Sequence, residues 1–244
     1  MSIAIVNIGD SVVGDREGGV LEGDALVLRD GLIAWIGNTD EVCSDEHDQV
    51  VDVNGATVVP GLIDSHVHLD SDAGGQQALL EALTSSPGTN ALRAQWNGMK
   101  TLRAGFTTVR DVGSMGYSDV ALRDAIDAGE MVGPRVYASG PSIGIAGGHC
   151  DMNLLRPEIP YHAEGVAIGP DAVRVAVRQN VRYGADVIKY CGTGGVFSKG
   201  TVPGRQQFTA EEVAALVDEA HMHGRRVAVH AHGADGIKVA IRAG

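Results

Sequence analysis

Short apolar runs of the kind that forms β-strands fill the first 57 residues of the chain. Four of them lie at 3–8, 23–28, 32–36 and 50–53, and Asp30-Gly31 between the second and third is a hairpin signal. We therefore predict a small N-terminal β domain over residues 1–57.

From Val58 onward the pattern changes to strand, loop and helix in repetition. Helical spacing of apolar residues marks 92–102, 118–126, 170–184 and 209–220, and a further helix begins near 234. Thr209 and Glu212 have the spacing of a capping box. Between these segments, strand candidates end near His68, Asp111, Gly140, Lys189 and His230. Strands that alternate with helices favour parallel βαβ units, so we predict an α/β fold, a TIM-type (β/α) barrel, over residues 58–244.

The number of strands does not suffice for a closed barrel. Such a barrel needs eight strands, and the sequence supplies about five, which would leave two open edges. We expect the natural polypeptide to continue past Gly244. A second chain that completes the barrel, or a degenerate open fold, are the alternatives.

The composition fits a globular protein with a sizeable core. Hydrophobic residues make up 44% of the 244 residues, and the net charge is −12. A strongly acidic chain argues against nucleic acid or an acidic membrane as partner. No signal peptide or membrane span is apparent, and the three cysteines, Cys43, Cys150 and Cys191, are widely spaced. We expect a cytoplasmic protein with neither a disulfide framework nor a cysteine-type zinc site.

His66 and His68 stand where the first barrel strand ends. Residues two apart on a strand point to the same face, so both imidazoles converge and could form half of a site for a first-row metal, usually Zn. A solvated or hydrogen-bonded histidine pair would show the same spacing. Four other histidines, His47, His162, His221 and His223, do not end strands and are predicted to lie on the surface or in loops.

Six sequence motifs together resemble those of the amidohydrolase superfamily. They are V-V-P-G-L-I-D-S-H-V-H-L at 58–69, G-F-T-T-V-R-D-V-G at 105–113, G-P-R-V-Y-A-S-G at 133–140, G-G-H-C-D at 147–151, D-V-I-K-Y at 186–190 and V-A-V-H-A-H-G at 227–233. The chain looks most like the metal-dependent Xaa-Pro/Xaa-Arg dipeptidase branch, to which imidazolonepropionase is related. The resemblance implies a composite N-terminal β-sandwich beside the barrel and a C-terminal third that this chain lacks.

The resemblance also implies two divalent metal ions, with Zn the first expectation. Lys189 matches the lysine that takes up CO2 as a carbamate and bridges both metals, and His66, His68 and His230 match further ligands. A snorkelling lysine at an exposed strand end is the ordinary alternative for Lys189. His232 would contact the metal-binding residues without binding the metal itself, or it would make a structural hydrogen bond.

Three further positions carry roles by resemblance. His149 would hydrogen-bond the scissile carbonyl or its oxyanion, so that His149 and Lys189 form the predicted catalytic pair. Tyr190 would reach the carboxylate of the substrate, unless it is a packed aromatic. Asp111 would orient a metal-binding histidine, or only cap a turn.

The expected function is metal-dependent hydrolysis of a C–N bond, in a dipeptide or an N-acyl amino acid, by a metal-bridging hydroxide. The substrate would be a small molecule or dipeptide, and a homo-oligomer is expected. A cyclic-amide hydrolase or a deaminase of the same superfamily uses similar ligands. A truncated, non-catalytic relative that acts in assembly is the alternative from another class. By resemblance, a further histidine and the proton-transferring aspartate lie beyond Gly244, which puts the activity of these 244 residues alone in doubt.

Overall fold

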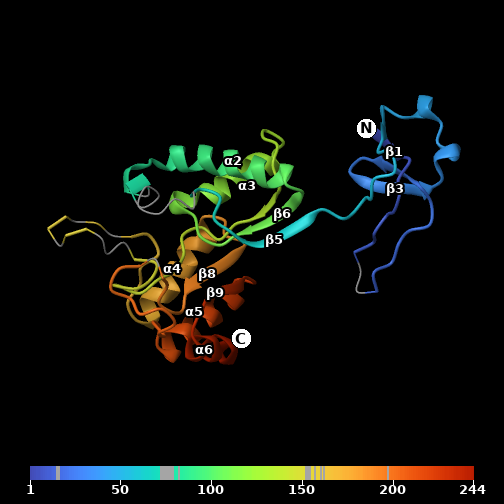
Figure 1. Cartoon of the computed structure of the whole chain (residues 1–244). Helices are drawn as coiled ribbons and strands as arrows, with labels where there is room; N and C mark the ends of the chain where they lie inside the picture. The colour runs from blue at the N-terminus through green and yellow to red at the C-terminus, as the bar shows by residue number, and fades with distance from the viewer. Residues whose placement is uncertain are drawn as a thin grey trace. The chain divides into compact units, whose positions relative to one another are not determined.

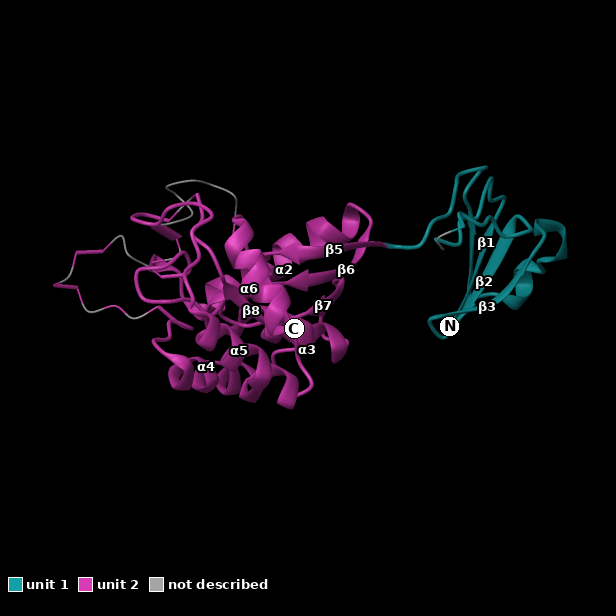
Figure 2. Cartoon of the chain, turned by 90° about the horizontal axis from the view of Figure 1, so that it is seen from below, with its two compact units in different colours: residues 1–61 teal, residues 62–244 magenta. Residues whose placement is uncertain are grey.

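The computed structural model describes residues 1–14, 17–71, 80–81, 83–151, 155–156, 158–159, 161, 163–196 and 198–244. They divide into two compact units, Met1–Gly61 and Leu62–Gly244, shown in different colours in Figure 2. Among the described residues, no helix is long and apolar enough to cross a membrane.

The first unit contains one four-stranded sheet in the order β3-β2-β1-β4. Its strands are β1 (Ser2–Val6), β2 (Ala25–Arg29), β3 (Leu32–Gly37) and β4 (Gln49–Asp52), with short 3-10 turns at Thr39–Glu41 and Ser44–Glu46. Arg29 pairs with Leu32, and the two residues between them, Asp30 and Gly31, have φ of 51° and 80°. Positive φ at both positions is what a two-residue hairpin requires, so the hairpin signal is confirmed.

The second unit contains five parallel strands that follow one another in chain order (Figure 1). They are β5 (Leu62–Val67), β6 (Phe106–Asp111), β7 (Arg135–Tyr137), β8 (Val187–Cys191) and β9 (Arg226–His230). The β5-β6-β7 sheet is linked to the β8-β9 pair by backbone hydrogen bonds, from Val187 N to Ala138 O at 3.3 Å and from Ile143 N to Lys189 O at 2.8 Å. The carboxyl ends of all five strands therefore lie along one edge.

Helices separate these strands along the chain. They are α2 (Pro87–Arg103), α3 (Ser118–Asp127), α4 (Pro170–Arg182), α5 (Ala210–Met222) and α6 (Ala234–Ala243), and the 3-10 turn Met115–Tyr117 precedes α3. The Thr209 side chain accepts from Glu212 N at 3.2 Å, and the Glu212 carboxylate accepts from Thr209 N at 2.8 Å, which confirms the capping box. The predicted alternation of strands and helices is present.

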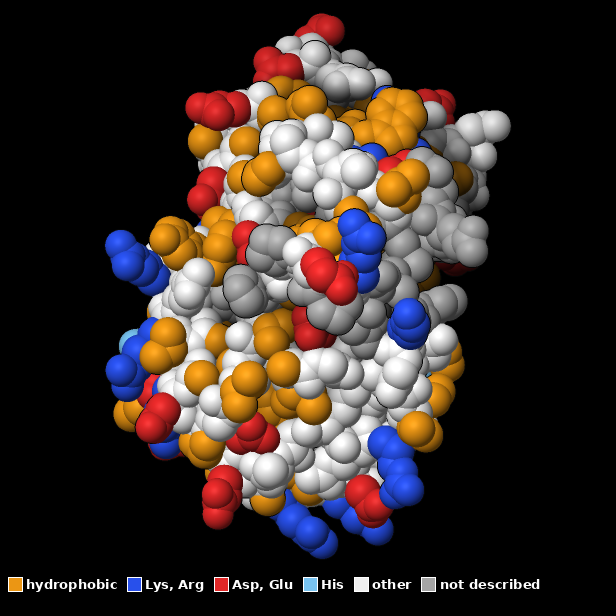
Figure 3. All heavy atoms as spheres, turned by 90° about the vertical axis from the view of Figure 1, so that its left-hand side faces the viewer, with side chains coloured by type: hydrophobic (Ala, Val, Ile, Leu, Met, Phe, Trp, Pro, Cys, Tyr) orange, Lys and Arg blue, Asp and Glu red, His pale blue; other side chains and the backbone are white. Residues whose placement is uncertain are grey.

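Two apolar clusters hold the second unit together. One joins α4, α5 and β8 through Val177, Leu216 and Ile188, and the other joins α2, α3 and β6 through Ala94, Leu122 and Val109. Small residues let α2 approach closely, since Ala94 and Gly98 are buried on it. The larger Leu92 and Trp96 of the same helix are exposed. Hydrophobic side chains lie among acidic and basic ones on the face shown in Figure 3.

A buried carboxylate joins α4 to α5. The Glu219 side chain is 2% exposed and accepts from Arg178 Nε at 2.6 Å and from Arg174 Nη1 at 3.1 Å. Those hydrogen bonds, that of Arg178 above all, lower the pKa of Glu219 to about 2 against the desolvation that raises it. Glu219 is therefore ionised at neutral pH and stabilises the helix pair.

Candidate active site

His66 and His68 lie together at the carboxyl end of β5. Their ring centroids are 5.4 Å apart. His68 Nδ1 hydrogen-bonds the carbonyl oxygen of Gly113 at 2.9 Å, so Nδ1 carries the proton and Nε2 is left as an electron-pair donor. Desolvation first, and then the charge of Lys189, lower the pKa of His66. Desolvation also lowers the pKa of His68, because together with the charge of Lys189 it outweighs the hydrogen bond to Gly113, which raises that pKa. Both rings are thus neutral at neutral pH, the form that binds metals.

Lys189 projects from the middle of β8 and is 3% exposed. Its Nζ donates to the Val112 carbonyl at 3.4 Å. Burial, followed by the positive charge of Arg110, lowers the pKa of Lys189 to about 8, although Asp111 opposes the shift. A substantial fraction of its amine is neutral near that pH and can react as a nucleophile.

His149, His230 and His232 lie together, with the His230 ring tilted against that of His149 and edge-on to that of His232. The ring centroid of His230 lies 4.2 Å from that of His149 and 4.6 Å from that of His232. Desolvation lowers the pKa of His230 to about 4, with further contributions from His149, His232, Lys189 and His66. These couplings join the three imidazoles to the pair on β5, so five of the predicted residues share one electrostatic environment: His66, His68, Lys189, His149 and His230.

Asp111 holds the backbone that positions His68. The carboxylate is fully buried, with Oδ2 accepting from Leu69 N at 2.9 Å and Oδ1 from Gly113 N at 3.3 Å. Leu69 follows His68 in the chain, and Gly113 provides the carbonyl that binds its ring. These two hydrogen bonds fix the backbone at both ends of the contact between the His68 ring and the Gly113 carbonyl. Desolvation raises the pKa of Asp111 well above its usual range, and the nearby Asp119 adds to the shift.

Tyr190 is not brought to this region. It is 1% exposed, belongs to the apolar cluster between α4, α5 and β8, and packs edge-on against Phe208 with ring centroids 5.5 Å apart. Successive side chains of a strand point to opposite faces, so Tyr190 points away from Lys189. The packed-aromatic interpretation of Tyr190 is the one that its surroundings support.

Cys150 and Cys191 are paired in a disulfide, with their Cα atoms 6.1 Å apart. The spacing of the cysteines does not predict this pair, although a single bridge is not the disulfide framework that the spacing argues against. The segment after β7 runs alongside β8, where Ile143 bridges to Tyr190, and this brings the residue after His149 next to the end of β8. Cys43 is free and exposed.

The donors present fit a metal site in their chemistry. Among the described residues no group of three or more His, Cys, Asp or Glu is clustered tightly enough to hold a metal ion by itself. His230 Nε2 is buried and lacks a hydrogen-bond partner in the described part of the chain. A buried nitrogen left unpaired is costly, and a metal ion would satisfy it.

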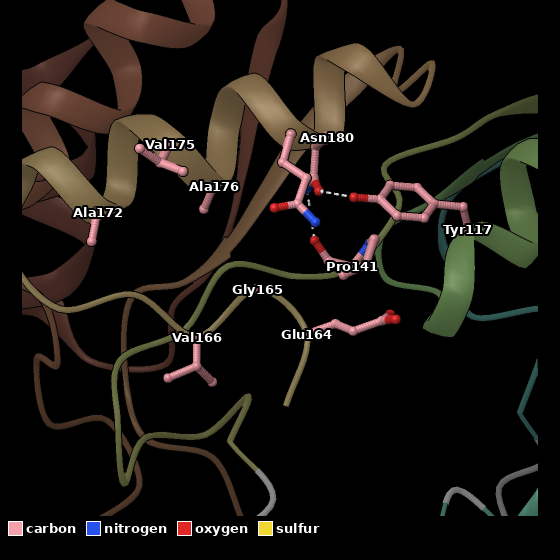
Figure 4. Close-up of a pocket in the computed structure, with 10 residues that line it drawn as sticks. Tyr117, Pro141, Glu164, Gly165, Val166, Ala172, Val175, Ala176 and Asn180 are labelled. Atoms are coloured by element: carbon pink, nitrogen blue, oxygen red, sulfur yellow. Dashed lines mark hydrogen bonds between the residues drawn. The ribbon is translucent and has the colours of Figure 1, made fainter. Parts of the chain in front are cut away.

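A separate pocket of about 350 Å³ lies beside α4 (Figure 4). Tyr117, Glu164 and Asn180 line it, and Tyr117 Oη donates to Asn180 Oδ1 at 3.1 Å. None of the histidines above contributes to its wall.

Three of the remaining histidines, His47, His221 and His223, are described, and they lie away from the carboxyl ends of the strands. His47 bonds Ser2 Oγ at 2.8 Å in the first unit, and His223 bonds Glu219 at 3.2 Å just after α5. His221 is exposed, and His162 lies outside the described residues.

Comparison with known proteins relates the chain to a protein family. The model of the amidohydrolase family matches residues 57–244. The chain belongs to the amidohydrolase family. Divalent metals are used generally across that superfamily, and the TIM-barrel type of α/β fold of its members agrees with the prediction for residues 58–244.

Curated relatives extend the match to nearly the whole chain. Ochratoxinase from Aspergillus niger is 33% identical over 258 residues, which cover 99% of this chain and 53% of that protein. Enamidase from Eubacterium barkeri is 26% identical over 94% of this chain and 50% of its own length. The chain thus spans about half the length of these relatives. A solved Xaa-Pro dipeptidase with methionine in its active site is 36% identical over the whole chain and 60% of its own, with a TM-score of 0.89.

Two residues near His149 carry no signal in the sequence. Ser198 Oγ lies 2.7 Å from His149 Nδ1, and Gly195 lies against the imidazole ring. Both stand in a loop between β8 and α5, where neither a strand end nor a motif marks them.

Proposed function

We propose that the protein is a metal-dependent hydrolase of C–N bonds, acting on a dipeptide or an N-acyl amino acid. The observation that carries this is the gathering of His66, His68, Lys189 and His230 from β5, β8 and β9 at one end of the parallel strands. Reacting groups of (β/α) barrels sit at that end.

Two divalent ions, Zn in the first instance, would be held by the paired histidines and a carbamate of Lys189. When bound, such ions polarise an amide carbonyl and activate water at neutral pH. The lowered pKa of Lys189 supports the carbamate, because only the neutral amine adds CO2. The lowered pKa values of His66, His68 and His230 support binding, because no proton has to be displaced at neutral pH.

His149 would bind the carbonyl oxygen of the scissile amide. It lies beside His230 and is half-buried, and desolvation lowers its pKa, so the ring is neutral and offers one N–H. A fixed donor at that point stabilises the negative charge that develops on the oxygen during attack.

Hydrolysis of Xaa-Pro dipeptides by the metal-loaded protein tests the proposal, because a solved Xaa-Pro dipeptidase is among the most similar structures. N-acyl amino acids and a cyclic amide complete the substrate panel. We expect release of the amine product, its loss in His66→Ala, and its retention in the matched variant His221→Ala. Hydrolysis that survives His66→Ala, or no hydrolysis of any member of the panel, would refute the proposal.

A further inference from the structure

The imidazole of His149 is held on several sides. Its backbone N–H donates to Gln207 Oε1 at 3.0 Å. The ring lies so close to Gly195 that a Cβ there would stand 2.2 Å from its Cε1 atom. The His230 ring is 4.2 Å away, at an interplanar angle of 37°. The position of the ring is thus built into the fold.

A chain of hydroxyl groups ends at Nδ1 of this ring. His149 Nδ1 lies 2.7 Å from Ser198 Oγ, which lies 2.8 Å from Thr201 Oγ1. The other contacts of these hydroxyls are longer: both reach the Gly195 carbonyl, Ser198 at 3.3 Å and Thr201 at 3.2 Å, and Thr201 reaches the Ser198 carbonyl at 3.4 Å.

The short contacts allow two directions of proton donation. Each hydroxyl has one proton to donate and accepts with its lone pairs. In one direction Thr201 donates to Ser198 Oγ and Ser198 donates to His149 Nδ1; in the other, His149 donates to Ser198, Ser198 to Thr201, and Thr201 to the Gly195 carbonyl. The role proposed for His149, an N–H offered to the substrate on the side away from Ser198, requires the first direction. A neutral imidazole that accepts at Nδ1 carries its proton on Nε2.

We propose that Ser198 is a positioning residue of the active site: together with Thr201 it holds His149 as the Nε2–H tautomer and directs that N–H to the substrate carbonyl. The two ring nitrogens point apart, so with Nδ1 at Ser198 the Nε2 edge is turned away from the hydroxyl chain. The choice of tautomer and the target of the N–H both rest on the proposed function, whereas the measurement of the tautomer needs no hydrolysis.

The tautomer is measured by 15N NMR of the histidine side chains in the full 244-residue chain without metal. The His149 signals are identified by their disappearance in His149→Gln. We expect the pattern of an Nε2–H imidazole in the wild type and in Ser198→Thr, which keeps the hydroxyl, and a mixture of tautomers in Ser198→Ala. The matched variant Ser44→Ala, in the first unit, should leave the spectrum of His149 unchanged.

An Nδ1–H pattern in the wild type would overturn the assignment, because Ser198 would then accept from His149 and donate to Thr201. An unchanged His149 pattern in Ser198→Ala would overturn it as well. Circular dichroism and thermal unfolding verify that the variants are folded.

Kinetics of the metal-loaded protein test the second half of the proposal. We expect kcat to fall about tenfold in Ser198→Ala, with KM changed less than about twofold, and to recover in Ser198→Thr. A changed KM with unchanged kcat would refute a role in the reaction step. Absence of hydrolysis in the wild type would refute the proposed function, whereas the NMR result would still decide the tautomer.

Discussion

Replacing Gly195 by Ala tests how closely the reaction depends on the place of the His149 ring. The added Cβ would stand 2.2, 2.4 and 2.6 Å from Cε1, Nδ1 and Nε2 of His149, whereas ordinary contacts begin at 3.4 Å. The ring must therefore move by about 1.2 Å. A misplacement of that size costs a reaction about 10²-fold in rate, so we expect kcat/KM of the metal-loaded protein to fall by about that factor.

The same substitution should lower stability moderately, because crowding a ring that is packed on several sides costs about 1–3 kcal/mol. Losing the hydrogen bond from Ser198 to His149 costs about 1 kcal/mol, and Gly→Ala returns about 0.4–1 kcal/mol by restricting the unfolded chain. The backbone of Gly195 does not have a positive φ, so alanine adds no strain of that kind. Urea unfolding should place the variant about 1–3 kcal/mol below the wild type.

Gly88→Ala is the matched control, because the nearest atom to its added Cβ is Ser86 Oγ at 3.7 Å and the site lies on α2. We expect wild-type hydrolysis and a gain of about 0.5–1 kcal/mol. If Gly195→Ala displaces the His149 signals in the NMR spectrum and yet hydrolyses at the wild-type rate, the argument that the ring position matters fails.

Three further outcomes follow from the structure. Glu219→Gln should lower the free energy of unfolding by about 1–2 kcal/mol at pH 7. This value is smaller than the full pKa shift of Glu219 would give, because solvent screens the exposed Arg178 partner. The pKa of Glu219 in the folded protein, about 2, lies below its ordinary value of 4.5. The stability difference between wild type and Glu219→Gln should therefore be full above pH 4.5 and shrink as the pH falls towards 2, and urea unfolding that shows no such change would contradict the prediction. Thiol titration of the denatured, unreduced protein should count one group, Cys43, and three would exclude the disulfide. Metal uptake by the wild type should rise with bicarbonate and with pH through about 8, as Lys189 loses its proton. Uptake by Lys189→Met should not respond to bicarbonate, and equal uptake by the wild type and this variant would exclude the carbamate.

Much of the fold could be predicted because local pattern and tertiary position agree. Apolar runs that end in His68, Asp111 and His230 became the carboxyl ends of parallel strands or the residues next to them, whereas β8 continues two residues past Lys189 to Cys191. The helices after them followed from apolar spacing and from the Thr209 cap. Spacing did not show which side of α2 packs, because close approach at Gly98 selected the small residues and left Trp96 exposed.

The candidate site was less predictable at residues whose neighbours depend on the course of the folded chain and not on the local sequence. Strand alternation, which placed His66 beside His68, also separates Tyr190 from Lys189, and it favours the packed tyrosine. The disulfide could not be read from spacing, since its cysteines are 41 residues apart and meet only because one loop runs along β8. Ser198 and Gly195 act through contacts with a ring that arrives from another loop, so no local pattern identifies them.

Metal content per chain tests the central claim most directly. The protein is purified without chelators, and its Zn, Mn and Co are measured beside those of the variants His66→Ala and His221→Ala. The account predicts close to two metal ions per chain in the wild type and in His221→Ala, and a clear loss in His66→Ala, since His66 belongs to the gathered ligands and His221 does not. Little or no metal in the wild type, or the same content in His66→Ala, would contradict it and would favour a non-catalytic relative with an incomplete site.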